Sequence, residues 1–229
     1  MLNMMRLDLL GTKSFWVRIA LTMLVPFALL LSDQLYFVIF IMAYFMMDAV
    51  YLIFQAEEKG DLNLLYMTLP LTRRIIVASR FVLAVAAMFL GLILGILLMY
   101  IGSALLYGRT IIFQHSFVPS FDMVVLTACV TIVYCAIVNL FTMPTLLKMG
   151  FARGKVIGFY GPALAMYGVI VIYVIAMLNS DAVFDFTMST SAWITGNIAL
   201  SSSILLSIAA LFFAASYLLS QRVFERRDF

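Results

Sequence analysis

Charged residues are scarce in this chain, and long apolar runs take their place. Only 11% of the 229 residues are Asp, Glu, Lys or Arg, and 66% are hydrophobic, whereas soluble domains carry about 25% charged residues. The stretches between the apolar runs are too short to form a soluble domain of their own. The composition therefore predicts an integral membrane protein, and any nucleotide-binding module is expected on another chain.

Residue types that carry chemistry are also few. The only histidine, His115, has no Cys or carboxylate at ligand spacing, which argues against a metal site. The two cysteines, Cys129 and Cys135, fall on different faces of one predicted helix, too far apart for a disulfide. No Gly-x-x-x-x-Gly-Lys-[Ser/Thr] loop is present, which excludes ATP hydrolysis by that route. We expect no catalytic residue, no metal and no cofactor on this chain.

Six apolar runs can each cross a hydrocarbon core about 30 Å thick. They cover residues 17–31, 35–54, 75–107, 123–147, 156–178 and 198–219. One threading through them places every one of the 14 Lys and Arg residues except Arg109 on the same side. By the positive-inside rule, both termini are predicted to be cytoplasmic. The predicted fold is an all-α single transmembrane domain over 1–229 with an interfacial helix at 1–16, and 108–122 and 179–197 are predicted external loops.

The predicted cytoplasmic segment between the second and third runs has a specific pattern. Its apolar residues share one face of a short helix: Leu62, Leu65, Tyr66 and Leu69. Acidic residues stand in or before the first turn, where they suit the helix dipole: Glu57, Glu58 and Asp61. The next helix opens with basic residues that we expect to project into the cytoplasm: Arg73, Arg74 and Arg80. Such a segment can transmit a push from a cytoplasmic protein, and a solvated loop is the simpler alternative.

At these residues the chain resembles the ABC-2 type permeases, the membrane subunits of ATP-driven exporters. The acidic-basic cluster is followed by a Thr-Leu-Pro-x-[Ser/Thr]-Arg step, formed here by Thr68, Leu69, Pro70, Thr72 and Arg73. The six-span layout with both ends inside extends the resemblance over the whole chain. Closer analogues are permeases that export amphipathic peptides, such as phenol-soluble modulins, or peptide antibiotics.

The resemblance implies a half-transporter in the plasma (inner) membrane of a bacterium. It implies that ATP and Mg bind partner ABC ATPase subunits, which contact the segment from Glu57 to Arg74. It also implies a second permease subunit, identical or related. Membrane lipid is the other expected partner. Nucleic acid is not expected, because the basic residues are divided among separate segments instead of forming one stripe.

The second run carries the only acidic residue inside a predicted span, Asp48. An ionisable group within a membrane costs a few kcal/mol and usually marks function. Tyr44 and Tyr51 lie about one helical turn to either side. These three residues are therefore candidates for lining or gating a translocation path. Structural pairing between helices is the alternative, although no basic residue in the sequence is an assured partner for Asp48.

Small residues and prolines predict how the helices pack. Gly91 and Gly95 in the third run, and Gly154 and Gly158 at the start of the fifth, allow close helix approach within one subunit or across a dimer. Pro162 removes a backbone hydrogen bond and predicts a kink near the start of the fifth run. Threonine hydroxyls of the fourth run are expected to bond to carbonyls or neighbouring helices.

Three function classes follow from these patterns. The preferred one is the permease subunit of an ATP-driven exporter of amphipathic peptides or peptide antibiotics. An ATP-independent secondary transporter would need repeated halves with broken helices, which the sequence does not show. An intramembrane enzyme using Asp48 would need a second convergent catalytic group, and none is evident. Co-purification with a soluble ATPase separates the first class from the other two.

Overall fold

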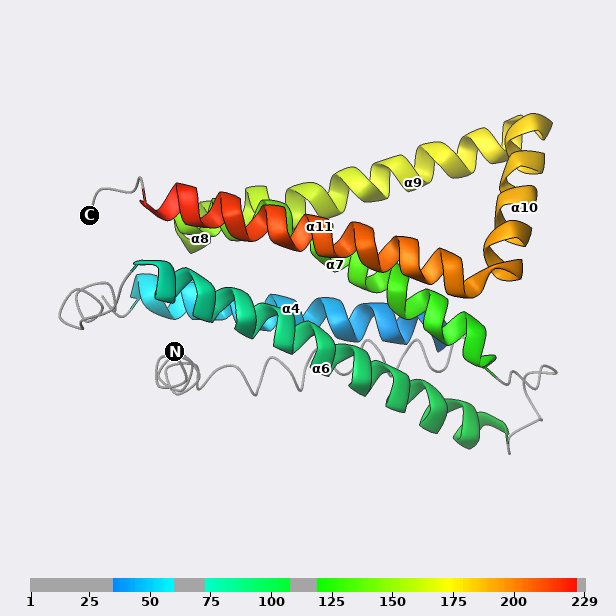
Figure 1. Ribbon diagram of the computed structural model, residues 1–229, viewed down its shortest axis with the longest axis horizontal. Coiled ribbons are helices and arrows are strands. Elements are labelled where there is room, and N and C mark those ends of the chain that lie inside the picture. Colours follow the sequence, from blue (N-terminus) through cyan, green and yellow to red (C-terminus); the bar gives the residue numbers. More distant parts are fainter. Residues whose placement is uncertain (1–34, 60–72, 108–118, 226–229) are drawn as a thin grey trace.

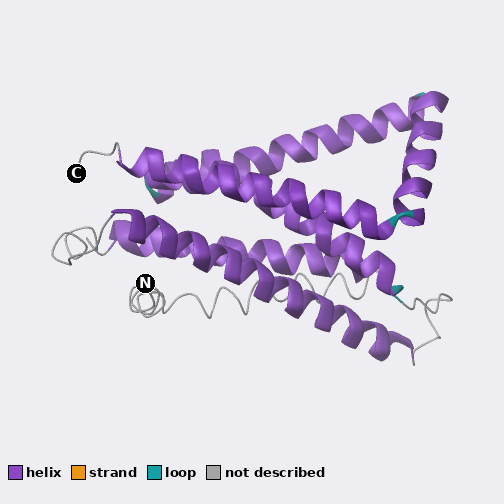
Figure 2. Cartoon of the chain, viewed as in Figure 1, coloured by secondary structure: helices purple, strands orange, loops and turns teal. Residues whose placement is uncertain are grey.

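Helices account for all the regular structure in the part of the chain that the computed structural model describes, residues 35–59, 73–107 and 119–225 (Figure 2). They are α4 (Leu35–Lys59), α6 (Arg73–Tyr107), α7 (Phe121–Met149), α8 (Phe151–Lys155), α9 (Gly161–Asn179), α10 (Asp181–Gly196) and α11 (Ile198–Glu225), with a π-helical turn, η1 (Val156–Tyr160), between α8 and α9. The predicted all-α class therefore holds for these ranges. The predicted interfacial helix and the first apolar run lie outside them.

Among the described residues, four helical stretches are long and apolar enough to cross a membrane: Arg74–Ala104, Phe121–Met149, Phe151–Asn179 and Ile198–Glu225. They are rich in Leu, Ile, Met and Ala, and most of these residues favour helices. α4 is also apolar over its first part, Leu35–Asp48. The described helices thus make a multi-pass arrangement, and six spans remain a prediction.

The helices run up and down, and neighbours in sequence are mostly neighbours in space (Figure 1). α4 packs along α6, α7 packs along α11, and α4 also contacts α7. Phe81 of α6 meets Phe213 and Tyr217 of α11 at ring centroid distances of 6.0 and 5.5 Å. These contacts join the two helix pairs into one bundle.

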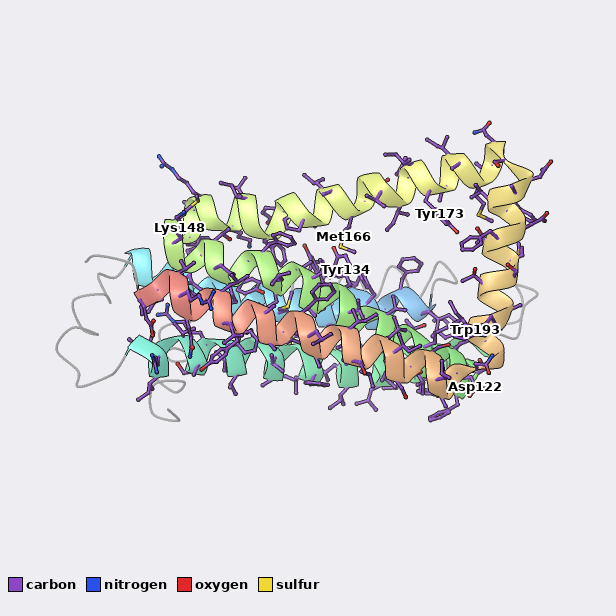
Figure 3. All side chains as sticks on the ribbon, turned by 45° about the horizontal axis from the view of Figure 1, so that its top comes forward. Asp122, Tyr134, Lys148, Met166, Tyr173 and Trp193 are labelled. Atoms are coloured by element: carbon purple, nitrogen blue, oxygen red, sulfur yellow. The ribbon has the colours of Figure 1, made fainter. Side chains whose placement is uncertain are left out.

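Basic residues gather at one end of this bundle, at the left of Figure 1, which we call the basic end. The end of α4, the first turns of α6, the end of α7, the short helix α8 and the end of α11 all lie there. Every Lys and Arg of the described ranges belongs to one of these helix ends: Lys59, Arg73, Arg74, Arg80, Lys148, Arg153, Lys155 and Arg222. Figure 3 shows Lys148 at this end and Asp122 with Trp193 at the other.

The prediction of a loop over 179–197 was wrong, because residues 181–196 form α10. This helix lies across the end of the bundle opposite the basic end and joins α9 to α11 (Figure 1). Asp181 stands in its first turn, where it suits the helix dipole, and the Tyr173 and Thr187 hydroxyls lie 2.6 Å apart, linking α9 to α10. The segment is too polar for a span, but no Gly or Pro interrupts it before Gly196, so a helix can form.

The first glycine pair packs α6 directly against α4. A Cβ atom on Gly91 would lie 2.7 Å from the Cα of Ala43, and one on Gly95 would lie 2.8 Å from the Cα of Ile39. Such distances are too short for any side chain, so glycine is required at both positions. Of the two alternatives that the sequence left open, packing within one subunit is what the structure shows for this pair.

Candidate functional site

Asp48 has a basic partner from a distant part of the chain. The Lys155 ammonium lies 2.8 Å from an Asp48 carboxylate oxygen, and the two side chains are 12% and 26% exposed respectively. Removing one member of such a pair leaves a poorly solvated charge, which costs about 3–5 kcal/mol when burial is complete and less here. The pair therefore fixes α4 against the segment that joins α8 to η1.

Close packing on α7 brings Lys155 to this position. A Cβ atom on Gly154 would lie 2.8 Å from the Cα of Leu146, and one on Gly158 would lie 2.9 Å from the Cα of Thr142. Thr142 also donates a hydrogen bond of 2.8 Å to the Gly158 carbonyl. The second glycine pair therefore also packs within the subunit, and it holds the residues between its members close to α7.

The π-helical turn η1 ends two residues before Pro162, the residue at which the sequence predicts a kink. A π turn is a common way for a helix to accommodate a local irregularity, and such turns are frequent at functional sites. Here η1 carries Phe159, which is 1% exposed. The irregularity thus lies between Lys155 and the regular helix α9.

Aromatic rings surround the ion pair. Phe159 stacks on Tyr44 at a centroid distance of 4.7 Å and meets Tyr51 edge-on at 5.6 Å. Tyr44 in turn lies 5.8 Å from Tyr134 of α7. The structure therefore brings the three candidate path residues, Tyr44, Asp48 and Tyr51, together on one side of α4, and it adds Phe159 to them.

A buried polar contact continues from Tyr51 into the bundle. The Tyr51 hydroxyl donates to the Asn139 side-chain oxygen of α7 at 3.2 Å, and the Ser216 hydroxyl of α11 donates to the Asn139 carbonyl at 2.9 Å. All three residues are fully buried. Hydrogen bonds of this kind contribute about 0.6–2 kcal/mol each to helix association in membranes.

Threonine hydroxyls of α7 are satisfied by backbone carbonyls. Thr131 donates to Thr127 at 2.7 Å, Thr142 to Val138 at 2.7 Å, and Thr145 to Phe141 at 2.8 Å. The expectation that these hydroxyls bond to carbonyls is confirmed for these positions. Thr142 and Thr145 also bond to the Gly158 and Gly154 carbonyls, at 2.8 and 3.3 Å, so these two link α7 to the neighbouring segment.

An apolar groove of about 520 Å³ runs between α9 and the bundle, and we call it the α9 groove. α9 diverges from α7 and α11 on its way to α10 (Figure 1) and buries no residue. The lining comes from α4, α7, α9 and α11 and includes Phe37, Phe40, Tyr134, Ile137, Met166 and Tyr167. Figure 3 shows Tyr134 and Met166 on facing sides of this groove.

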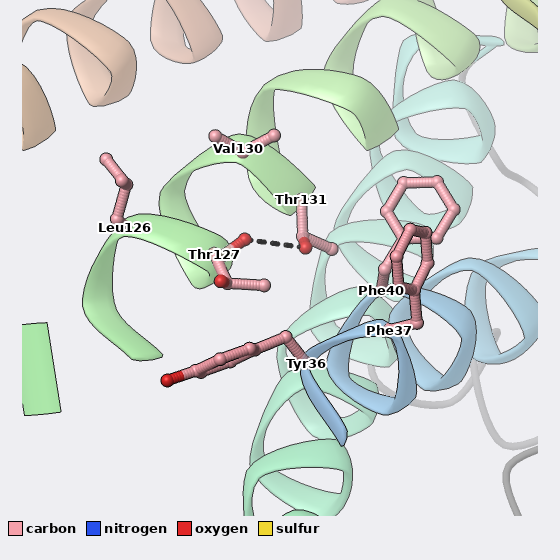
Figure 4. A pocket seen from close by; sticks show the side chains of 7 residues that line it. All are labelled: Tyr36, Phe37, Phe40, Leu126, Thr127, Val130 and Thr131. Carbon is pink, nitrogen blue, oxygen red and sulfur yellow. Dashed lines mark hydrogen bonds between the residues drawn. The ribbon is translucent and has the colours of Figure 1, made fainter. Parts of the chain in front are cut away.

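A second, smaller groove of about 270 Å³ lies between α4 and α7 (Figure 4). Its walls are Tyr36, Phe37 and Phe40 of α4 and Leu126, Thr127, Val130 and Thr131 of α7. The two grooves share Phe37, Phe40 and Val130. They therefore adjoin one another along the same face of α4 and α7.

The start of α6 departs from the sequence expectation at one residue. Arg74 is exposed and makes an ion pair of 2.9 Å with Glu225 at the end of α11. Arg80 was expected to project into the cytoplasm, but it is only 2% exposed and lies over the Phe54 ring at 4.6 Å from its centroid. The expectation for Arg80 was wrong because α4 packs along this turn of α6 and covers it.

The remaining candidate coupling residues fall at or beyond the ends of helices. Glu57 and Glu58 belong to the last turns of α4, and Arg73 is the first residue of α6. The others, Asp61, Leu62, Leu65, Tyr66 and Leu69, lie outside the described residues. Their assignment as contacts for an ATPase stays a prediction.

Sequence reasoning missed Lys155, Phe159 and Asn139 as neighbours of the candidate path residues. The sequence placed Lys155 in the short basic stretch between the fourth and fifth apolar runs. One signal for its position was available: Lys155 stands directly after Gly154 and inside the Gly154–Gly158 motif, which indicates close approach to another helix. Nothing in the sequence indicated which helix that was.

The fold and the site define a class of protein: a multi-pass helical membrane protein with an ion pair and aromatic rings at one end of its bundle. The family model described as ABC-2 family transporter protein matches residues 3–225. The chain belongs to this family, which confirms the resemblance seen at the sequence level. No curated protein and no solved structure is significantly similar to the chain.

Membership of this family assigns the chain a general role. It is a membrane permease of an ABC transporter, and its family implies an ABC ATPase as partner.

Proposed function

We propose that this chain is the permease subunit of an ABC exporter that moves amphipathic peptides or peptide antibiotics out of a bacterial cell. The observation that carries the proposal is the family match over nearly the whole chain. Separate ATPase subunits bind ATP and Mg and drive the cycle. A second permease subunit, identical or related, completes the path, and the assembly lies in the plasma membrane.

Coupling runs through the segment from Glu57 to Arg74. This segment joins α4 to α6, so a push on it reaches both helices at the basic end. α4 continues for about three turns beyond Asp48 toward this segment. Because α4 carries Asp48 and Lys155 belongs to another element, a tilt of α4 changes the geometry of their ion pair. Closure of the ATPase subunits on ATP is thereby linked to the candidate path residues.

The α9 groove supports an amphipathic cargo. Its lining is apolar and aromatic, and it approaches Tyr44 through the Tyr134 and Phe40 rings at 5.8 and 6.4 Å. A molecule with one apolar side and one charged side can place the first in the groove and the second near the Asp48–Lys155 ion pair. The gathering of Lys and Arg at the basic end favours a cytoplasmic position for that end.

A pull-down from native membranes tests the proposal. The tagged chain is solubilised in mild detergent, and an ABC ATPase is expected to co-purify with it. Leu62→Asp and Leu65→Asp place a charge on the predicted apolar stripe and are expected to abolish recovery of the ATPase. Asn63→Asp is the matched control, because it adds the same charge off the stripe and is expected to retain the partner.

The outcomes separate the proposal from its alternatives. Recovery of the ATPase with wild type and Asn63→Asp, but not with the leucine variants, supports both the partner and its docking segment. A folded wild-type chain that recovers no ATPase, and that transports without ATP, would contradict the proposal. Uptake of a labelled amphipathic peptide into inside-out vesicles, with and without ATP, measures the transport direction.

A further inference from the structure

The Lys155 ammonium occupies a site built for a cation. On one side lies the Asp48 carboxylate at 2.8 Å. On the others lie the rings of Phe151, Phe159 and Tyr160, whose centroids are 5.4, 5.7 and 5.6 Å from the ammonium. A cation within about 6 Å of a ring centroid is attracted by the ring's quadrupole. We call Asp48 and these three rings the ammonium site.

The ammonium site is connected to the α9 groove by stacked rings. Phe159 stacks on Tyr44 at 4.7 Å, and Tyr44 meets Tyr134 at 5.8 Å. Phe40 lies 4.6 Å from Tyr134, and both line the groove. A carboxylate and an apolar groove are thus neighbours, separated only by aromatic side chains. This arrangement matches a molecule that carries an ammonium group next to an apolar surface.

The Lys155 ammonium can leave the site for a position where its charge is hydrated. Lys155 is the last residue of α8, at the basic end of the bundle. A lysine near a helix end can extend its stem and place its ammonium at the membrane surface. Asp48 is 26% exposed, so a second cation can reach it. An exchange of cations keeps the carboxylate paired throughout, which avoids the cost of a lone charge in a poorly solvated position.

We propose that the ammonium site binds a lysine side chain or the amino terminus of a cationic amphipathic peptide, and that Lys155 fills the site until cargo displaces it. The peptide's apolar face then lies in the α9 groove. This inference rests on the proposed function for the identity of the cargo. In this inference Asp48 recognises the cargo and Lys155 competes with it from within the protein. Substitution of the two residues is therefore expected to change cargo affinity in opposite directions.

Binding of a defined probe tests these roles. The probe is a fluorescein-labelled amphipathic helix of leucine and lysine, titrated against the full chain in phosphatidylcholine nanodiscs and followed by anisotropy. Lys155→Met removes the competitor and is expected to tighten binding about tenfold, the factor for a competitor that fills the site in about nine-tenths of molecules. Asp48→Asn is expected to weaken binding about tenfold. Lys148→Met, an exposed basic residue at the same end, is the matched control and is expected to change affinity less than twofold.

The decisive result is that the two substitutions change peptide affinity in opposite directions. If the pair only holds helices together, Lys155→Met and Asp48→Asn both weaken binding or both leave it unchanged, and the proposal is overturned. The same probe with its lysine side chains and its amino terminus acetylated is expected to respond to neither substitution, and an equal response would overturn the proposal too. Lys155→Gln serves as a second variant, and thermal unfolding of each protein confirms that affinities are compared between folded chains.

A lipid headgroup is the competing ligand for the ammonium site, and a change of nanodisc composition distinguishes it from a peptide. Phosphatidylethanolamine also carries an ammonium group, and adding it to the nanodiscs is expected to leave peptide binding to Lys155→Met unchanged. Suppressed binding would assign the site to lipid and overturn the peptide assignment. Failure of the exporter proposal is recognised separately. In that case no ATPase co-purifies, while Lys155→Met and Asp48→Asn still change peptide affinity in opposite directions.

Discussion

Replacing Gly158 by alanine probes the contact that positions Lys155 and Phe159. The added Cβ would lie 2.9 Å from the Thr142 Cα and 3.0 Å from the Phe141 carbonyl oxygen, and it would also meet the Thr145 hydroxyl. The first two are backbone atoms and cannot rotate away. Ordinary contact begins at 3.4 Å, so η1 and α7 must separate by about 0.5 Å, and overpacking of this kind costs about 1–3 kcal/mol.

Gly168 provides a matched control on the continuation of the same helix. A Cβ atom there meets nothing within 4 Å, so Gly168→Ala is expected to stabilise the helix by up to about 1 kcal/mol. The two alanine variants should therefore differ by about 1–4 kcal/mol. For a chain of this size, that difference corresponds to about 2–16 °C in Tm.

Thermal unfolding of both variants in one detergent measures this difference. Gly158→Ala is also expected to lower ATP-dependent transport, because it displaces the residues that carry the ammonium site and its stacking partner. Equal Tm values for the two variants would show that η1 does not pack on α7 as described, and the structural basis for the position of Lys155 would be lost.

Three further predictions concern other contacts. Tyr51→Phe removes the buried hydrogen bond to the α7 asparagine and is expected to lower the free energy of unfolding by about 0.6–2 kcal/mol, measured by thermal unfolding; no change would mean that the hydroxyl is hydrated. Glu225→Gln breaks the exposed ion pair with Arg74 and is expected to cost less than about 1 kcal/mol, with the loss vanishing in high salt. In a chain without its native cysteines, a membrane-impermeant maleimide applied to whole cells is expected to label Ser180→Cys and not Lys148→Cys. The reverse pattern would invert the predicted topology.

Features of the fold that depend on local sequence were predictable, and features that depend on contacts between distant segments were not. The helices at α6, α7, α9 and α11 begin and end close to the apolar runs, because apolar composition over some 20 residues is a local property. α10 was missed because a polar helix at a membrane surface has no apolar run to reveal it. The burial of Arg80 was missed because the packing of α4 over the start of α6 depends on two helices at once.

The candidate site divides in the same way. The sequence by itself determined that Asp48 is an acid inside an apolar run, that Tyr44 and Tyr51 share its side of the helix, and that glycine pairs permit close approach. Only the tertiary structure decided that Lys155 pairs with Asp48 and that Phe159 stacks on Tyr44. The physical reason is that helical periodicity fixes neighbours within one helix, whereas partners between helices depend on the register in which glycine surfaces pack together.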